Sequence, residues 1–462
     1  MSELLPIDRE LAEALPAGTL YAVGGRVRDE LRRETEAATA DRKDLDYVVT
    51  SLPAPELEKR LRTLGRVDLV GSAFSIFKVT IKDVTVDIAL PRRERSIGAG
   101  HRDYEVESGP DISLEDDLAR RDFRMNMLAR AIPSGELVDP YEGEADIRAR
   151  RIDILTDTTF EEDPLRMLRA AQFAARFSYT PTERTRSAMA GAAPLIATVS
   201  AERMADEFTK LFVLAGRPSI GLELLRETGV LAHIWPELLE GVGVEQNEWH
   251  AYDVYRHSLE TLDATPPGDL IVRLAALLHD VGKPRTKEGP HFYRHEQIGA
   301  EMAHDMLARL RFSNEVAQTV SHLVRQHMYV GDPELSDAAL RRLIRRIGVA
   351  HLDRQFCLRA ADISGSGLPK RGNSNERFQA RVYAEVARKP AFSVADLKIG
   401  GEDVIEAMVR KGVAPRGFRG DARVGEALRE LFEQVTERPE RNEPGTLRTL
   451  LEQHFDARRN AS

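Results

Sequence analysis

The sequence predicts an α/β head followed by an all-helical remainder, and three observations support this division. Short runs rich in β-branched residues, expected to be strands at 19–23, 45–49, 77–81 and 84–90, alternate with helical stretches up to about residue 130. From about residue 140 onward, apolar residues recur at helical spacing. Nine of the twelve histidines fall between His250 and His351, which indicates a separate domain within the helical part.

The length of 462 residues exceeds what one hydrophobic core normally supports, so several domains are expected. We expect a head over 1–138, a helical neck over 139–244, a histidine-rich domain over 245–385 and a helical tail over 386–462. The polar stretch from Lys370 to Asn375 reads as a loop near the third boundary.

Bulk composition limits the classes of protein. No run of about 18 apolar residues occurs, so no membrane span is expected. A single cysteine, Cys357, excludes an internal disulfide and favours a reducing cytoplasm, and the first residues lack a secretory pattern. The net charge of −9 argues against a nucleic-acid binder on average, although basic clusters occur at 91–95 and 341–346.

A paired-glycine turn follows the first expected strand and opens a helix. Gly24 and Gly25 let the backbone approach a polyanion, and the amide groups at the start of the helix face it. Arg28, one turn later, adds a charged clamp. The turn predicts a phosphate site, although a glycine pair alone is weak evidence.

Asp44 and Asp46 enter the next expected strand two residues apart, so their carboxylates point to one face. Like charges at close range require cations, and oxygen ligands suit Mg²⁺. Asp87, in a later apolar strand, is a candidate third carboxylate. The alternative is a set of solvated aspartates at strand ends.

A third motif lies at Glu162-Asp163-Pro164, where Pro164 fits the first helical position and Asp163 the N-cap. Asp163 and Arg166 are then neighbours on one helix face, offering acceptors and donors to the edge of a base. The alternative is a capped helix with a local ion pair.

Five motifs in this order resemble the class II CCA-adding enzymes and bacterial poly(A) polymerases, which are tRNA nucleotidyltransferases of the polymerase-β-like superfamily with a mixed sheet in the head. The motifs are Gly24-Gly25-x-Val27-Arg28-Asp29, Asp44-x-Asp46, Arg120-Arg121-Asp122-x-x-x-Asn126, Asp139-x-x-x-Gly143 and Glu162-Asp163-x-x-Arg166. One departure is an additional acidic and alanine-rich piece at 34–40.

The resemblance implies roles for the matching residues. Asp44 and Asp46 would bind the catalytic Mg²⁺ ions, while Asp163 and Arg166 would read the base. The residues implied to bind nucleotide are Gly24, Gly25, Arg28, Arg121, Asp122, Asn126, Asp163, Arg166 and Arg169.

The implied reaction is attack of the tRNA 3′-hydroxyl on the α-phosphate of CTP or ATP, with two metal ions stabilising the attacking and leaving oxygens. A loop at 92–100 resembles the family's flexible loop, which takes part in switching from C to A. Full CCA addition, CC-only or A-only addition and poly(A) synthesis remain open as products. No stable protein partner is expected.

The histidine-rich domain carries an adjacent His279-Asp280 pair at the end of an apolar helix, with His257 before it and Asp362 after it. Imidazole and carboxylate ligands suit a divalent transition metal, and Mg²⁺ is a further option. One histidine on an apolar helix is usually a core residue, but an ordered set favours a metal site.

This set resembles the HD phosphohydrolase superfamily over about 245–380. The resemblance implies metal ligation by His257, His279, Asp280 and Asp362, with His295 and His327 as additional ligands or phosphate contacts, and phosphatase or 2′,3′-cyclic phosphodiesterase chemistry. By resemblance, the helical body and tail would hold tRNA, with the basic cluster at 341–346 as a candidate phosphate contact. An alternative of a different class is a phosphohydrolase whose head only binds RNA.

Overall fold

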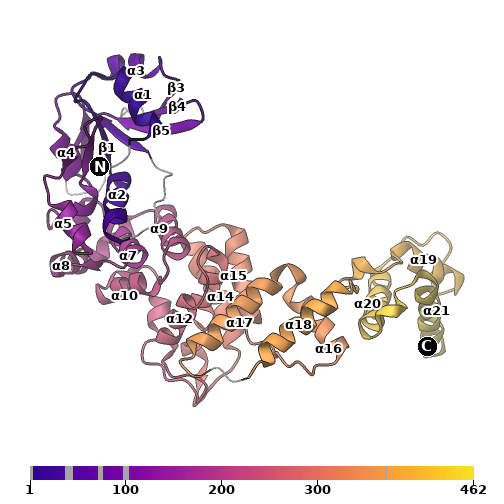
Figure 1. Ribbon diagram of the computed structural model, residues 1–462. Helices are drawn as coiled ribbons and strands as arrows, with labels where there is room; N and C mark the ends of the chain where they lie inside the picture. Colours follow the sequence, from indigo (N-terminus) through magenta and orange to yellow (C-terminus); the bar gives the residue numbers. More distant parts are fainter. Residues whose placement is uncertain (1–3, 37–44, 71–75, 97–103, 370–371, 462) are drawn as a thin grey trace. The chain divides into compact units, whose positions relative to one another are not determined.

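The computed structural model describes residues 4–36, 45–70, 76–96, 104–369 and 372–461, and the contacts divide the chain into two compact units. The first consists of Met1–Leu239 with two short pieces, Pro266–Leu270 and Arg309–Phe312. The second holds the rest of the chain to its C-terminus (Figure 1). No helix in the described ranges is long and apolar enough to cross a bilayer.

The head is built on a mixed sheet of seven strands in the order β3-β4-β5-β2-β1-β8-β9. Its strands are β1 (Leu20–Val23), β2 (Asp46–Val49), β3 (Arg66–Val70), β4 (Ile76–Ile81), β5 (Val84–Ala89), β8 (Ala129–Ile132) and β9 (Leu137–Val138). The β2–β5 pair is parallel, and the other pairs are antiparallel. The expected α/β head is confirmed, and each of the four expected strands occurs within a residue or two of its predicted bounds.

Around the sheet lie helices and a separate hairpin, whose elements are α1 (Pro6–Ala14), α2 (Gly25–Glu36), α3 (Ala54–Leu61), β6 (Arg92–Ser96), β7 (Tyr104–Ser108) and α4 (Leu114–Ala119). Val23, Val48, Leu118, Met127 and Ala129 form a buried cluster between strands β1, β2 and β8 and helix α4. This cluster fixes the strand ends at which the candidate residues lie.

The remainder of the first unit is helical, as the apolar spacing predicts. Its elements are α5 (Gly143–Arg148), β10 (Arg151–Ile152), α6 (Thr159–Glu162), α7 (Arg166–Phe177), β11 (Thr180–Pro181), α8 (Glu183–Ala192), α9 (Ala201–Leu214), α10 (Ser219–Glu227) and α11 (Pro236–Leu239). Helix α7 is central because it packs against both α9 and α10. Its buried face is rich in alanine and phenylalanine, which permits this close packing.

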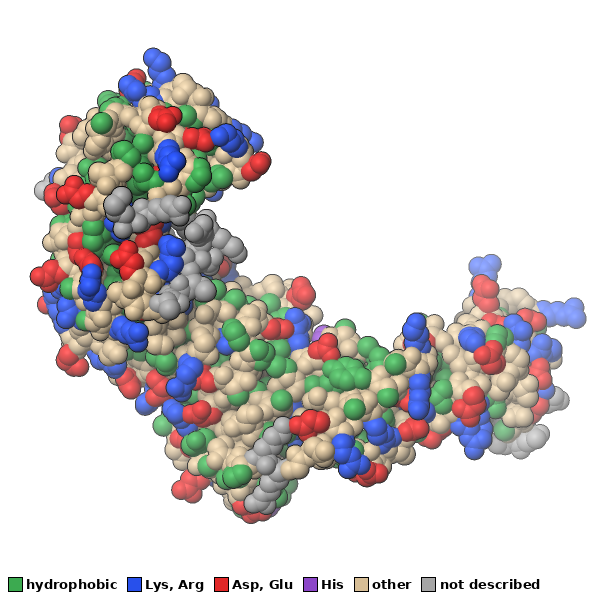
Figure 2. All heavy atoms as spheres, in the orientation of Figure 1, with side chains coloured by type: hydrophobic (Ala, Val, Ile, Leu, Met, Phe, Trp, Pro, Cys, Tyr) green, Lys and Arg blue, Asp and Glu red, His purple; other side chains and the backbone are tan. Residues whose placement is uncertain are grey.

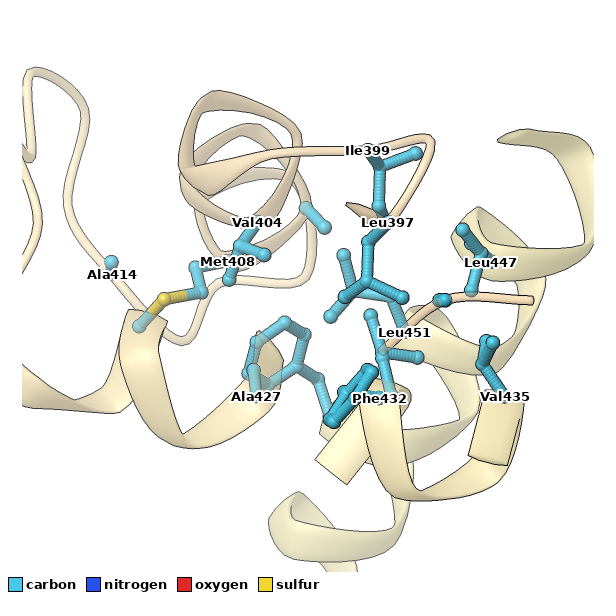
Figure 3. Close-up of a cluster of buried hydrophobic side chains, with 14 residues drawn as sticks. Leu397, Ile399, Val404, Met408, Ala414, Ala427, Phe432, Val435, Leu447 and Leu451 are labelled. Atoms are coloured by element: carbon cyan, nitrogen blue, oxygen red, sulfur yellow. The ribbon is translucent and has the colours of Figure 1, made fainter. Parts of the chain in front are cut away.

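The second unit carries the histidine-rich region and the tail. Its elements are α12 (Val254–Asp263), α13 (Leu270–Leu278), β12 (Lys287–Glu288), β13 (His291–Phe292), α14 (His295–Arg309), α15 (Asn314–Gln326), α16 (Asp337–Ile347), α17 (Leu352–Gly365), α18 (Ser374–Ala387), α19 (Gly401–Arg410), α20 (Ala422–Glu437) and α21 (Pro444–Ala461). The tail has its own core, in which Val404, Met408, Phe432 and Leu451 meet from the last three helices (Figure 3).

Acidic and basic side chains are interspersed over the visible face of the molecule (Figure 2). In the basic cluster of α16, arginines form ion pairs with acidic residues of other helices. Arg341 is buried against Glu385, with Nε 2.5 Å from Oε1, while Arg345 pairs with Glu433 of α20 at 2.8 Å. The buried Arg341 is therefore not accessible to a phosphate, whereas Arg345 is exposed and its role as a phosphate contact stays a prediction.

Candidate functional site

A cavity of about 490 Å³ in the first unit brings together most of the head residues singled out from the sequence. The predicted residues that line it are Gly24, Gly25, Arg28, Asp46, Arg121, Asp122, Asn126, Asp163, Arg166 and Arg169. They come from the β1–α2 turn, strand β2, the segment after α4 and the start of α7. Elements that are far apart in sequence therefore form one polar pocket.

Backbone conformation and steric contact explain why glycine is required at position 24 of the turn. Its φ of +68° lies in the left-handed region that glycine adopts without strain. A Cβ at this position would lie 2.8 Å from Nη1 of Arg121. Gly24 therefore allows the Arg121 guanidinium to approach the backbone at the start of α2.

Asp46 is the first residue of β2, and parallel pairing places it opposite Asp87 of β5. Residues in register on neighbouring strands point to the same face of a sheet, so the two carboxylates share one face. Asp87 is half-exposed, and Lys78 Nζ lies 3.9 Å from its Oδ1. Asp87 does not line the cavity itself, and Asp44 lies outside the described residues.

The buried carboxylate of Asp8 links the glycine turn to strand β2 through hydrogen bonds. Asp8 of α1 accepts hydrogen bonds from Arg26 (Nη2 to Oδ2, 2.6 Å) and from the Tyr47 hydroxyl (2.5 Å). Burial would raise the pKa of Asp8, but the hydrogen bonds from Arg26 and Tyr47 outweigh it and lower that pKa. The residues beside Gly25 and Asp46 are thus tied together, which fixes the spacing of the turn and the carboxylate.

A hydrogen-bonded network crosses the cavity wall from α2 to α7. Arg28 Nη1 donates to Asn126 Oδ1 at 2.8 Å, and Asn126 Nδ2 donates to Asp122 Oδ1 at 2.8 Å. Arg169 completes it, with Nε 2.7 Å and Nη2 2.6 Å from Asp122 Oδ2. Burial would raise the pKa of Asp122, but the charge of Arg169 lowers it, so the carboxylate is ionised at neutral pH.

The start of α7 differs from the sequence-based expectation. Helical residues begin at Arg166, and Asp163 ends the preceding helix α6 rather than capping α7 directly. Tight turns over 163–168 separate the two helices, although Asp163 Oδ1 still accepts from the Leu165 amide at 3.2 Å. Proline at 164 favours this because it removes one amide donor and fixes its φ.

Asp163 and Arg166 both line the cavity, but each has partners within the protein. Arg203 Nη2 lies 3.0 Å from Asp163 Oδ2. Arg166 donates to Glu162 Oε2 at 2.9 Å and to the Arg120 carbonyl at 2.7 Å. These bonds fix the plane of the Arg166 guanidinium before any base is present, and a base-reading role stays a prediction.

The second unit brings the six predicted histidine and aspartate ligands together. Asp280 lies at the centre, with Oδ2 3.1 Å from His279 Nε2 and 3.5 Å from His257 Nε2. Its other oxygen, Oδ1, lies 3.5 Å from His295 Nε2 and 3.6 Å from His327 Nε2. The two oxygens thus face two groups of histidines.

Asp362 completes the first group, with Oδ1 3.2 Å from His257 Nε2. The residues in each group offer ligand atoms within 4.8 Å of one another, as His257–His279–Asp280 and as Asp280–His295–His327. Each group could hold a divalent cation, and Asp280 belongs to both groups.

Backbone carbonyls orient all four rings. The Nδ1 atoms lie 2.6–3.1 Å from carbonyl oxygens of Gly365, Ala276, Phe292 and Val324, for His257, His279, His295 and His327 in that order. An Nδ1–H donated outward leaves Nε2 as the inward ligand atom, which is how metal-binding histidines are normally held.

The chemistry of Asp280 also fits a cation. Both of its oxygens are buried, and neither accepts a hydrogen bond of regular geometry from the described part of the chain. Such groups are costly to bury unless a charge compensates them. Lys283 Nζ, 2.6 Å from Oδ2, provides part of that charge. Burial would raise the pKa of Asp280, but the charges of His279 and Lys283 lower it well below its usual range.

Comparisons with known proteins match the regions of the chain that hold the two candidate sites. Family models for the poly A polymerase head domain, the probable RNA and SrmB-binding site of polymerase A and the HD domain match residues 20–153, 178–241 and 250–364. The multifunctional CCA protein of Cupriavidus necator is 33% identical over 80% of this chain and 89% of its own length. That of Stenotrophomonas maltophilia is 37% identical over 71% of this chain and 80% of its own length.

The chain belongs to the multifunctional CCA protein family. It is a tRNA nucleotidyltransferase by this membership. The fold agrees: the CCA-adding enzyme of Bacillus stearothermophilus, solved in complex with CTP, matches with a TM-score of 0.68 at 22% identity, covering 99% of this chain and 100% of that one. The resemblance inferred from five motifs is confirmed, as is the mixed-sheet head followed by helical regions and an HD domain.

Several further residues contribute to the head cavity although none of the five sequence motifs contains them. Those that line the head cavity are Gln172, Phe173, Arg176, Glu207 and Lys210. Phe173 and Arg176 lie four and seven residues after Arg169, so helical spacing could have indicated them. Glu207 and Lys210 come from α9, and only the packing of α7 on α9 places them there.

In the HD domain, His250 also lies beside the predicted ligands, although no sequence motif indicates a role for it. Its ring centroid lies 4.6 Å from that of His257, and its ligand atoms belong to a further group with His257 and Asp362. Burial lowers the pKa of His250 to about 4, so it is neutral at physiological pH. Its position seven residues before His257 was the only signal available in the sequence.

Proposed function

We propose that this enzyme adds C and A to the 3′ end of tRNA, using CTP and ATP as substrates. The observation that carries the proposal is the head cavity, which combines a glycine turn, an aspartate at a strand end and a buried Arg28–Asn126–Asp122–Arg169 network. Relatives named multifunctional CCA proteins support it, as do solved CCA-adding enzymes in complex with CTP and with ATP.

The residues divide the work by charge. Arg28, Arg121 and Arg169 present guanidinium groups to the cavity and would neutralise a triphosphate. Asp46 and Asp87, with Asp44 nearby in sequence, have the oxygen chemistry to hold Mg²⁺. Bound there, Mg²⁺ would lower the cost of deprotonating the tRNA 3′-hydroxyl and stabilise the leaving pyrophosphate. The protein contributes position and fixed charge.

Base selection is proposed for Asp163 and Arg166. A carboxylate acceptor and a guanidinium fork complement the exocyclic amino group and ring nitrogen that C and A share. Both residues are already held by Arg203 and Glu162, so little reorganisation is needed to present these atoms. The alternatives within the same chemistry are A-only addition, CC-only addition and poly(A) synthesis.

The products distinguish these alternatives. The enzyme would be incubated with tRNAs that end before, within and after CC, with CTP or ATP given separately. Stepwise addition of both bases supports CCA synthesis, and A added only to a CC end supports an A-adding enzyme. Long A tails support poly(A) synthesis, whereas no addition to any tRNA contradicts nucleotidyl transfer altogether.

A second activity is proposed for the HD domain, where hydrolysis of phosphate esters at RNA ends fits the ligand cluster. Six ligand residues around the bridging Asp280 carry this proposal. Two divalent cations bound there would supply an activated water and charge for the phosphate. Lys283 Nζ lies 2.6 Å from both Gln246 Oε1 and Asp280 Oδ2, which holds the amino group beside the cluster.

His279→Ala tests this assignment. Phosphate-ester hydrolysis would be followed with a 2′,3′-cyclic nucleotide and with bis(p-nitrophenyl) phosphate, in the presence of Mn²⁺, Ni²⁺ or Mg²⁺. Loss of hydrolysis with retained CTP incorporation places the activity in the HD domain. Unchanged hydrolysis by the variant contradicts the assignment. Conversely, unchanged nucleotide addition by Asp46→Ala would favour a phosphohydrolase with an RNA-binding head. We propose the cytoplasm as the compartment, in keeping with tRNA as substrate.

A further inference from the structure

A separate cavity of about 290 Å³ lies beside the second group of HD ligands. It is lined by Glu296, Gln297, Arg325, Gln326, Met328, Tyr329 and Arg346. Two of these residues directly follow the ligand His295, and others directly precede or follow the ligand His327. The start of α14 and the end of α15, which carry most of the cavity lining, therefore also carry the ligands His295 and His327. Its volume is near the lower end of the roughly 300–1,000 Å³ usual for small-ligand sites, enough for about one nucleotide.

The charge of this cavity favours an anion. Arg325 and Arg346 contribute two exposed guanidinium groups, against one carboxylate from Glu296. Arg325 makes only a long contact with Glu301, 3.8 Å between two exposed side chains. Among residues in the described ranges, Arg346 has no ion pair. Its neighbour Arg345 on the same helix pairs with Glu433, so the difference is specific to Arg346.

The remaining residues that line the cavity offer apolar, amide and aromatic groups, which can contact the base and sugar of a nucleoside. Met328 is 54% exposed immediately after a buried ligand, and Gln326 and Gln297 supply amide groups. Tyr329 is buried, and its ring stacks on that of Phe378, with centroids 5.8 Å apart. Its hydroxyl has no hydrogen-bond partner among the residues that the structure describes. A buried hydroxyl without a partner is costly, and a ligand or water at this wall would satisfy it.

A contact chain joins this wall to the metal ligands. The guanidinium carbon of Arg359 lies 5.9 Å from the Tyr329 ring centroid, and Arg359 Nη1 donates to Asp362 Oδ2 at 3.3 Å. Asp362 in turn contacts His257. Arg359 and Asp362 thus link the Tyr329 wall of the cavity to the His257 group of ligands.

We propose that this cavity binds the second-last nucleotide of an RNA chain whose terminal phosphate ester is hydrolysed at the HD centre. Arg325 and Arg346 would contact the phosphodiester that joins this nucleotide to the terminal one. The inference rests on the proposed phosphohydrolase function and extends it. It makes the HD centre selective for the end of an RNA chain over a free mononucleotide, because only a chain reaches both the metal ligands and the cavity.

Substrate length tests the proposal with the full-length enzyme. The kcat/KM for a dinucleotide ending in a 2′,3′-cyclic phosphate would be divided by that for the cyclic mononucleotide. We expect the ratio to exceed about ten, the factor contributed by one charge-assisted hydrogen bond, mainly through KM. Arg346→Ala and Arg325→Ala should each reduce the ratio, and Arg346→Lys should restore part of it. Arg429→Ala, an exposed arginine of α20, serves as the matched control and should leave the ratio unchanged.

Two results would overturn the proposal: a ratio near one in the unaltered enzyme, or a ratio that the Arg325 and Arg346 variants do not change. If bis(p-nitrophenyl) phosphate is not hydrolysed with any metal, the phosphohydrolase function has failed. In that case, anisotropy with a fluorescent dinucleotide 3′-phosphate still decides about the cavity. Weaker binding to Arg346→Ala than to Arg429→Ala supports it, and equal binding refutes it.

Discussion

Asp46 and Asp87 lie opposite each other on the parallel strands β2 and β5, forty-one residues apart in the sequence. Their side chains share one face of the sheet because they are in register. Two carboxylates this close repel each other without cations, so the pair is a natural place for Mg²⁺.

Asp46→Ala and Asp87→Ala should each lower the rate of CTP incorporation into tRNA by about a thousandfold or more, since each removes a carboxylate that stabilises transition-state charge. Asp68→Ala, on the exposed strand β3, is the control and should leave the rate unchanged. A normal rate for Asp87→Ala would exclude Asp87 from the catalytic set while leaving Asp46 in it.

Gly24→Ala should raise the KM for CTP by about tenfold, because the new Cβ would displace the Arg121 guanidinium from the cavity. Gly18→Ala is matched to it, with a φ of +79° and open space around a Cβ. Both variants should lose about 1–2 kcal/mol of stability through backbone strain. Equal KM values for the two would show that strain alone explains the effect.

Asp122→Asn should destabilise the first unit at neutral pH by about 3 kcal/mol, since Arg169 would lose its buried charged partner. The folded-state pKa of Asp122 is lowered. The charged carboxylate therefore stabilises the fold above the unfolded pKa of about 3.9, and this contribution is lost as the pH falls through the lower folded value. Urea unfolding at pH 7 and at acidic pH measures both effects, and an unchanged acid dependence in the variant would contradict them.

The HD centre should bind two equivalents of a divalent metal per chain. We expect His257→Ala and His295→Ala each to remove one equivalent, and Asp280→Asn to weaken both, because Asp280 faces both groups of histidines. Metal analysis after dialysis against Mn²⁺ measures this directly. His304→Ala, an exposed histidine of α14, is the control. Loss of both equivalents from His295→Ala would argue against two separable sites.

The arginines of α16 should differ in their effect on stability rather than on tRNA binding. Arg341→Ala removes the buried guanidinium partner of Glu385 and leaves only the exposed Arg388 at 3.0 Å, which should cost about 3 kcal/mol. Arg345→Ala removes a surface pair and should cost less than about 1 kcal/mol. Thermal unfolding checks the difference. A large loss of tRNA affinity in Arg345→Ala, at unchanged stability, would support the phosphate-contact hypothesis for that residue.

Local sequence was informative where the signal spans one turn or one strand. The period-two runs located the strands at Asp46 and Asp87, and the glycine pair located the turn before α2. The candidate HD ligands could also be singled out, since His279 and Asp280 are adjacent and the other histidines cluster in the same region of the sequence. At the start of α7 the local signal failed by about two residues, because the tight turns around Pro164 keep Asp163 outside the helix.

The sequence by itself determined the α/β head, the helical remainder and the residue types available for each site. Only the tertiary structure decided that Asp46 pairs with Asp87, that Glu207 and Lys210 line the head cavity, and that Arg341 is buried while Arg346 is exposed. The physical reason is that the two sources of information act over different distances along the sequence. Residue periodicity reports which face of an element is apolar, whereas strand pairing and helix packing select which distant element covers that face.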